Sequence, residues 1–404
     1  MRNRILPNLF AGITMAMLTA WSLSARAQVI VVTSSPDEAC AFSFDENFNQ
    51  INIGTYVDGV CHLPEWDLMQ SVVFVGASDV DVVADGALHN CGGLIVESSS
   101  NVSVSKIDCG EAFFGPQVYS SNNITLEKLN FQSSEGGLGR ALDIQGSQGV
   151  MASQLNFEGA FDTVNIASSS DVSVDKSSFD LADGVLFSNV FQSNDVSLDK
   201  LTATGGQRVM LISESTSVSL SQSTIILAGT GTDFDSVTVF DSSDLTFDRV
   251  TMDRRALTSG NCFRVNGTTD VTLSNNKCLS DPANTSGEAL NLTAVNNYLI
   301  DRNLFDGSAG GIFVSDNASG TDSNGEISRN TINMTGPYGL FLSGVSGLDV
   351  VRNNVTNTAG TGIAGTWYYD ENTEGTPLII NFDRNQYSGF AINGECNNLT
   401  MNCN

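Results

Sequence analysis

A short pattern of alternating apolar and polar residues returns through most of the chain and limits what it can fold into. In residues 170–180, Val172 and Val174 alternate with polar residues, a charged corner follows, and Phe179 comes next. Taking Val172 as a reference position, the copies fall at 80, 102, 124, 150, 172, 196, 218, 245, 271, 298, 325, 348, 380 and 399. The mean period of about 25 residues is typical of a solenoid.

Each copy carries three short apolar segments. Alternating pairs precede the reference position, as in Val164/Ile166, and a third apolar residue follows it, as Phe179 does. Period-2 alternation over short runs predicts half-buried strands. Three such strands per coil predict an all-β, single-domain, right-handed parallel β-helix over residues 72–404, with about fourteen coils.

Later copies place an asparagine at the corner, five residues after the reference position. We expect these side chains to form a coil-to-coil amide ladder and their backbones to be left-handed, because Asn tolerates that conformation. The residues are Asn276, Asn303, Asn330, Asn353 and Asn385.

Taken together, these features resemble the right-handed parallel β-helix repeat proteins of the pectin-lyase-like superfamily. The resemblance covers residues 72–404 and implies the fold without implying one activity. Many secreted members open with a strand and a motif of the type C-[ST]-L-R-E-A-I that starts a capping helix, and Cys61-x-Leu63-x-Glu65 is a partial copy. We therefore expect residues 28–71 to form an N-terminal cap with strands near Val29 and Ile51. Pro64 and the acids after it predict a short helix over residues 61–70.

The first 27 residues have the composition of an export signal. Arg2 and Arg4 precede an apolar run, and Ala25-Arg26-Ala27 predicts cleavage between Ala27 and Gln28. No later stretch of about 20 apolar residues follows, which predicts no transmembrane segment in the mature chain. We expect a monomer that is secreted or held at the cell surface, with the periplasm as an alternative.

Eight cysteines in an exported chain favour disulfides. Connectivity cannot be read from spacing, but pairing between neighbours is attractive because it would staple both ends and two intermediate coils. Because C-x-x-C spacing is absent and His62 and His89 are the two histidines, we expect no structural metal site. The neighbouring pairs are Cys40–Cys61, Cys91–Cys109, Cys262–Cys278 and Cys396–Cys403.

The net charge of −27 argues against a nucleic-acid partner, because phosphate neutralisation needs clustered cations. It also disfavours polyanionic glycans unless calcium bridges them, so calcium is the one cofactor considered. A row of Lys and Arg lies four residues after the reference position, and it includes Lys176 and Arg302. It predicts either a cationic rail for an anionic glycan or, as we favour, a corner whose charges are offset by neighbouring acids.

Catalytic β-helix families provide sharper tests. The polygalacturonase family uses three aspartates and a nearby His, whereas this chain has no Asp-Asp pair and no His after His89. Pectate-lyase-like enzymes need a basic residue to abstract a proton. The best candidate cleft lies on the variable loops between coils, and paired carboxylates there could also support glycoside hydrolysis. Its candidate catalytic residues are Asp233, Asp235, Asp253, Arg254, Arg255 and Glu288.

A second candidate site lies in the longest predicted loop, residues 356–375. Trp367, Tyr368 and Tyr369 could stack on sugar rings, or they could cover the core. Missing catalytic motifs favour a binding or structural role at the cell exterior, towards polysaccharide or a cell-surface glycan. The alternative is a polysaccharide lyase or glycoside hydrolase acting on the loop face.

Overall fold

The computed structural model describes residues 28–32, 40–44, 50–64, 66–84, 88–133, 139–161, 163–181, 186–228, 235–283, 286–315, 324–369 and 379–397. The chain divides into two compact units, Met1–Ala182 and Asp183–Asn404. The predicted export signal lies outside the described residues. In the part of the chain that is described, no helix has the length and hydropathy needed to cross a membrane.

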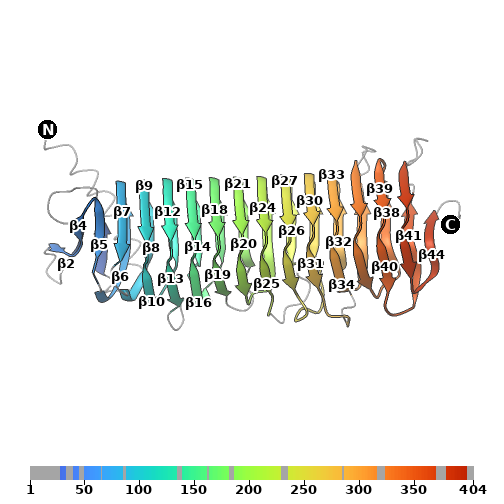
Figure 1. Cartoon of the computed structure of the whole chain (residues 1–404), viewed down its shortest axis with the longest axis horizontal. Coiled ribbons are helices and arrows are strands. Elements are labelled where there is room, and N and C mark those ends of the chain that lie inside the picture. The colour runs from blue at the N-terminus through green and yellow to red at the C-terminus, as the bar shows by residue number, and fades with distance from the viewer. Residues whose placement is uncertain are drawn as a thin grey trace. The chain divides into compact units, whose positions relative to one another are not determined.

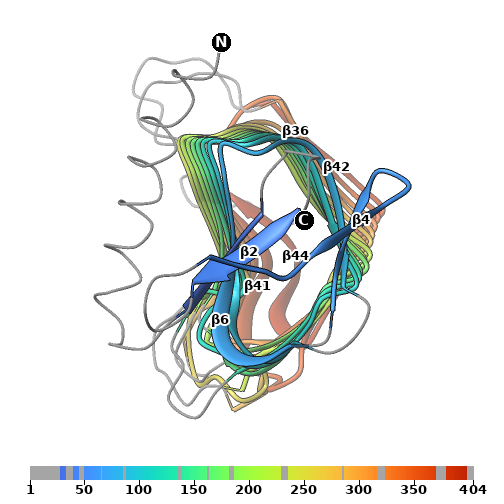
Figure 2. The same cartoon turned by 90° about the vertical axis from the view of Figure 1, so that its left-hand side faces the viewer.

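The first unit is a stack of coils with three short parallel strands each (Figure 1). The end-on view of Figure 2 shows its blue-to-green coils lying over one another with the same corners. The strands before the reference strand are β6 (Trp66–Val75), β8 (Leu88–Glu97), β11 (Pro116–Tyr119), β14 (Leu142–Gln145) and β17 (Val164–Ala167). The reference strands are β7 (Ser78–Ala84), β9 (Ser100–Ser105), β12 (Asn122–Glu127), β15 (Gln148–Ser153) and β18 (Ser170–Asp175). The third strands are β10 (Asp108–Ala112), β13 (Asn130–Ser133), β16 (Asn156–Phe161) and β19 (Ser178–Leu181).

The second unit repeats this plan. Its first strands are β20 (Leu186–Phe191), β23 (Arg208–Ser213), β26 (Val237–Phe240), β29 (Phe263–Asn266), β32 (Glu288–Thr293), β35 (Gly310–Ser315), β38 (Tyr338–Ser343), β41 (Gly362–Tyr369) and β44 (Phe390–Asn397). Its reference strands are β21 (Asn194–Asp199), β24 (Thr216–Ser221), β27 (Ser243–Asp248), β30 (Thr269–Ser274), β33 (Asn296–Asp301), β36 (Gly325–Ser328), β39 (Leu348–Val351) and β42 (Ile380–Asp383). The third strands are β22 (Thr202–Thr204), β25 (Thr224–Ile226), β28 (Thr251–Asp253), β31 (Lys277–Leu279), β34 (Leu304–Ser308), β37 (Thr331–Met334), β40 (Asn354–Asn357) and β43 (Gln386–Ser388).

Strand pairing follows the sequence period residue by residue. Val102 lies opposite Ile124 and Ile124 opposite Val150 in the first unit, and Leu245 lies opposite Val271 in the second. Reference positions 80–172 and 196–380 thus form one column in each unit, whereas position 399 lies outside the described residues. The predicted all-β parallel solenoid is confirmed.

Stacked side chains fill the interior at the third apolar position. The rings of Phe131, Phe157 and Phe179 lie over one another with centroids 5.6 Å and 5.0 Å apart, and all three are buried. Because equivalent positions meet in successive coils, one phenylalanine in each of these three coils produces a continuous aromatic stack in the core.

The segment predicted as a capping helix is extended. β5 (Val60–Leu63) and β6 occupy it on either side of Pro64, so the prediction of a helix over residues 61–70 is wrong. β6 pairs with β8 and with β1 (Gln28–Val32), and these neighbours satisfy backbone groups that a helix would satisfy internally. Pro64 has no N–H to donate and lies at the break between strands.

Antiparallel pairs complete this N-terminal region. The strands predicted near Val29 and Ile51 are present as β1 and β3 (Gln50–Asn52). β2 (Ala41–Phe44) pairs with both of them, and β4 (Thr55–Val57) pairs with β5.

The predicted asparagine ladder is present at the corners of the second unit. Asn303 Nδ2 donates to Asn330 Oδ1 at 3.0 Å and to the Leu273 carbonyl at 2.9 Å. The left-handed backbone lies one residue earlier, at Arg302, where φ is 55°. The prediction of left-handed asparagines is therefore wrong. Each asparagine turns its buried amide to its neighbours, and the exposed residue before it makes the bend.

Three predicted disulfides are confirmed. Cys40 pairs with Cys61, Cys91 with Cys109, and Cys262 with Cys278. Cys403 lies outside the described residues, so the Cys396–Cys403 pair stays a prediction. Three disulfides in one chain indicate an oxidising, extracytoplasmic environment.

Candidate functional site

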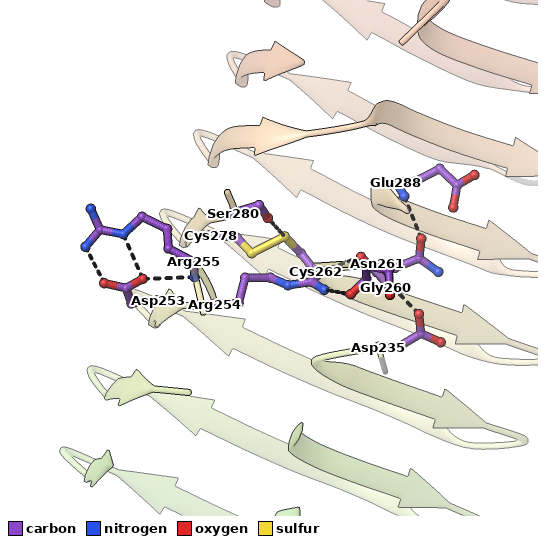
Figure 3. The surroundings of a disulfide bond; sticks show 11 residues. Asp235, Asp253, Arg254, Arg255, Gly260, Asn261, Cys262, Cys278, Ser280 and Glu288 are labelled. Carbon is purple, nitrogen blue, oxygen red and sulfur yellow. Dashed lines mark hydrogen bonds and ion pairs between the residues drawn. A yellow bond between two sulfur atoms is a disulfide. The ribbon is translucent and has the colours of Figure 1, made fainter. Parts of the chain in front are cut away.

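The predicted catalytic residues of the second unit surround the Cys262–Cys278 disulfide but do not converge. Figure 3 shows Asp253 and Arg255 on one side of this disulfide and Asp235, Asn261 and Glu288 on the other. Asp233 lies outside the described residues. The sequence placed these groups on neighbouring coils, but it did not reveal that the disulfide separates them.

Arg254 is buried beneath its own loop and has 1% of its surface exposed. Its Nη1 donates to the Gly260 carbonyl at 2.5 Å, and Nη2 donates to the Ser259 carbonyl. Burial lowers the pKa of the guanidinium to about 10, which leaves it protonated at neutral pH. Arg254 therefore holds the loop after β28 closed. A catalytic base must contact the substrate, and this buried side chain is not exposed to one.

Asp253 and Arg255 neutralise each other at the surface. Arg255 Nε donates to Asp253 Oδ1 at 2.9 Å, and Nη2 donates to Oδ2 at 2.5 Å. The hydrogen bonds from Arg255 lower the pKa of Asp253, and the carboxylate in turn raises the pKa of Arg255. This bidentate pair keeps Asp253 ionised and occupies both groups.

On the other side of the disulfide, polar residues form one column along the coils. The Asn261 N–H donates to Asp235 Oδ1 at 2.9 Å, and the Glu288 N–H donates to Asn261 Oδ1 at 2.6 Å. Gly310 lies opposite Glu288 on the next strand. The register that pairs Ile312 with Leu340 continues this column to Tyr338. Two predicted acids, Asp235 and Glu288, are thus brought onto the same face as an aromatic residue.

A second column on this face is aromatic. Phe313 lies opposite Phe341, and Phe341 lies opposite Trp367. Tyr338 contacts both later residues, with ring centroids 5.6 Å from Phe341 and 5.4 Å from Trp367. All four side chains are partly exposed. We call Glu288, Phe313, Tyr338, Phe341 and Trp367 the aromatic–acidic face.

The predicted aromatic trio belongs to strand β41 rather than to a loop. Trp367 and Tyr369 lie opposite Phe341 and Ser343, whereas Tyr368 lies opposite the buried Leu342 and contacts Phe382. Strand alternation therefore assigns Trp367 and Tyr369 to the outer face and Tyr368 to the core side.

The strand was missed because its inward pair, Thr366 and Tyr368, is not aliphatic. Thr366 is buried, and its hydroxyl lies 2.8 Å from the Tyr387 hydroxyl. Phe313, Tyr338 and Phe341 were also missed. The signal that could have found Phe313 and Phe341 is their place between the apolar pairs Ile312/Val314 and Leu340/Leu342.

The Lys and Arg row is paired with acids. Lys176 bonds to Asp175 at 2.7 Å and Arg249 to Asp248 at 2.7 Å, while Arg329 reaches Asp301 on the previous coil at 2.6 Å. Most pairs lie within one coil rather than across coils. The other pairs are Lys128–Glu127, Lys200–Asp199, Arg302–Asp301 and Arg384–Asp383. This geometry supports offset charges rather than a free rail.

The first unit contains one buried acid that sequence reasoning did not single out. Asp143 accepts hydrogen bonds from the Tyr119 hydroxyl at 2.8 Å, Arg140 Nη1 at 2.7 Å and Asn165 Nδ2 at 2.8 Å. Burial and the Asp143 carboxylate raise the pKa of Tyr119. Because protein donors surround both carboxylate oxygens, we assign this cluster to the fold.

No three His, Cys, Asp or Glu side chains in the described ranges converge as metal ligands would.

Comparisons with known proteins agree with this architecture. No curated protein matches the chain. Residues 211–374, which contain the whole aromatic–acidic face, match the family model described as "Right handed beta helix region", and this part of the chain is accordingly a right-handed β-helix.

Proposed function

We propose that the protein is an exported β-helix that binds carbohydrate through the aromatic–acidic face. The observation that carries the proposal is the column of Phe313, Phe341 and Trp367, joined by Tyr338, on an exposed sheet face. Exposed aromatic residues that converge with a few polar groups are typical of ligand sites. Carbohydrate is the class proposed because sugars present both C–H faces and hydroxyls.

The state of the charged residues favours binding over catalysis. Arg254 is buried under its loop, and Asp253 is engaged by Arg255. The disulfide also separates Asp253 from Glu288, so these two carboxylates do not face each other across one cleft (Figure 3).

The proposal is tested by measuring glycan binding with the mature chain. Titration calorimetry against a panel of soluble oligosaccharides should find a ligand, and Trp367→Ala should weaken it at least about tenfold because the ring supplies stacking area. Phe240→Ala is the matched control, because Phe240 is also a partly exposed aromatic residue on an outer sheet face but lies on β26. Circular dichroism would confirm that both variants fold.

Two results would contradict the proposal. One is the absence of binding to every glycan, and the other is equal affinity in the Trp367→Ala variant and the wild type. Product analysis in the same panel covers the enzymatic alternative. Turnover that is lost in Asp253→Asn would assign catalysis to the loop face instead.

A further inference from the structure

Resting on this proposed function, we infer that the site selects glycans that carry protonated amino groups over neutral and uronic-acid glycans. The selecting group is the carboxylate of Glu288, and the aromatic residues of the neighbouring coils supply the sugar-binding surface. The inference names a ligand class and a specificity-determining residue.

The Glu288 side chain lies along the face towards the aromatic residues. A Cβ built on Gly310 would lie 3.2 Å from Glu288 Cγ, so the acid side chain covers the glycine of the next coil. No hydrogen bond or ion pair engages the Glu288 carboxylate within the described residues, and the residue is partly exposed. The carboxylate is therefore available to a ligand.

Gly310 lies between Glu288 and Tyr338, and its missing side chain leaves room for the Glu288 side chain to lie over it. The three residues occupy successive coils, which puts the backbones of Glu288 and Tyr338 about 10 Å apart. A larger residue at 310 would crowd the Glu288 side chain. A sugar held by the aromatic rings can thus extend a substituent to the carboxylate.

Ring orientation determines where a sugar can stack. Phe313 and Phe341 lie face to face at 5.2 Å with an angle of 7° between their planes, so each covers a face of the other. Tyr338 and Trp367 are tilted by 41°, which leaves ring surface that no parallel neighbour covers. The Tyr338 hydroxyl has no hydrogen bond among the described residues and is available to a sugar hydroxyl. The stacking position is therefore at Tyr338 and Trp367.

The charges around the face favour a cation. Arg264 precedes the aromatic column on the same outer row, but it pairs with Asp235 at 3.6 Å. Among the residues that the structure describes, this pair leaves the Glu288 carboxylate without a compensating cation beside the rings. The protein as a whole carries −27, which adds long-range repulsion of uronic-acid chains. A carboxylate beside exposed rings combines ion pairing with cation–π attraction, and a protonated amine satisfies both.

The inference is tested with oligosaccharides that differ only in charge. Glucosamine oligomers and their fully N-acetylated counterparts of the same length should be titrated against the mature chain at low ionic strength and mildly acidic pH. We expect the amino form to bind about tenfold more tightly, with the difference shrinking as salt is added. Glu288→Gln should remove this preference, because the amino form loses its ion pair and binds about tenfold more weakly than it does to the wild type.

Glu326→Gln is the matched control, because it makes the same charge change on β36, which belongs to the reference strands. It should retain the preference. The inference is overturned if the two oligomers bind equally, if galacturonic-acid oligomers bind better, or if both Gln variants lose the preference alike. If both variants lose the preference, the overall negative charge of the surface, and not a site at Glu288, attracts the amino form. Failure of the proposed function itself would give a different result, because no oligomer would then bind and Trp367→Ala would have no effect.

Discussion

At the scale of single residues, the charged corners have a backbone role. The residue four positions after the reference position is left-handed in both units, with φ of 48° at Lys176 and 57° at Arg352. A residue with a Cβ in this conformation costs about 1 kcal/mol or more relative to glycine. The long unbranched chains of Lys and Arg reach solvent from this bend, and several of them, such as Lys176 and Arg249, pair with the preceding acid. The residues at this position are Lys106, Lys128, Gln154, Lys176, Lys200, Gln222, Arg249, Asn275, Arg302, Arg329, Arg352 and Arg384.

Substitution of Lys176 separates backbone strain from charge. Lys176→Val should destabilise the first unit by about 1–2 kcal/mol, because a β-branched residue fits poorly at positive φ. Lys176→Gly should change stability by less than about 1 kcal/mol, because glycine accepts this conformation. Both variants lose the Asp175 ion pair, whose Lys side chain is 56% exposed. Equal destabilisation in urea titrations would show that the ion pair, and not the backbone, dominates.

At the scale of elements, the asparagine ladder occupies a corner position that carries apolar residues or serine in the earlier coils, as at Leu155 and Ser177. Asn303 Oδ1 accepts from both the N–H and the Nδ2 of Asn276, at 2.9 Å and 3.0 Å. The Asn303 N–H then donates to Asn330 Oδ1 at 2.9 Å. Each asparagine thus satisfies backbone groups of its neighbours, and the register of adjacent coils is tied together by buried hydrogen bonds.

Removing one member should leave buried donors without acceptors. We expect Asn303→Ala to reduce the free energy of unfolding of the second unit by about 2–4 kcal/mol. Asn333→Ala, which removes an exposed coil-to-coil bond to Asp306, should cost about 0.5 kcal/mol or less. Chemical denaturation monitored by circular dichroism would compare them. Similar losses in the two variants would show that the ladder contributes no more than a surface bond.

At the scale of the whole molecule, disulfides fix segments whose conformation the repeat does not specify. Cys262–Cys278 joins two coils across a separation of 16 residues, beside the loop that Arg254 holds closed. Cys40–Cys61 links two segments of the N-terminal region in the first unit across a separation of 21 residues. Closing a loop of this length restricts the unfolded chain by about 3 kcal/mol in the entropic model.

The double variant Cys262→Ala/Cys278→Ala should lose about 2–3 kcal/mol of stability. Its loop 254–261 should also become cleavable by trypsin after Arg255, because release of the coil frees the Arg254 contacts. Mass spectrometry of limited digests would locate the cut. The double variant Cys40→Ala/Cys61→Ala is the control, and it should leave Arg255 protected. Protection in both variants would mean that Arg254 and the coil packing hold the loop without the disulfide.

Much of the fold could be predicted because the repeat uses short-range chemistry. The inward positions of Val172, Phe179 and their copies follow from alternation, and the coil register follows from aligning the copies at their reference positions. The failures occurred where this pattern was weak. Pro64 and the acids near it resemble a helix start, but β1 and β8 offered pairing edges that only the folded chain brings together.

The sequence by itself determined the solenoid and its columns, because both depend on the order of apolar residues along the chain. It favoured the neighbouring cysteine pairs, and the structure established three of them. Only the tertiary structure decided which side chains share a face. Arg254 is buried by its loop, Tyr368 is separated from Trp367 by strand alternation, and the Glu288 side chain lies over Gly310 of the next coil. These outcomes depend on side-chain direction and on contacts between coils, and residue spacing alone does not specify either.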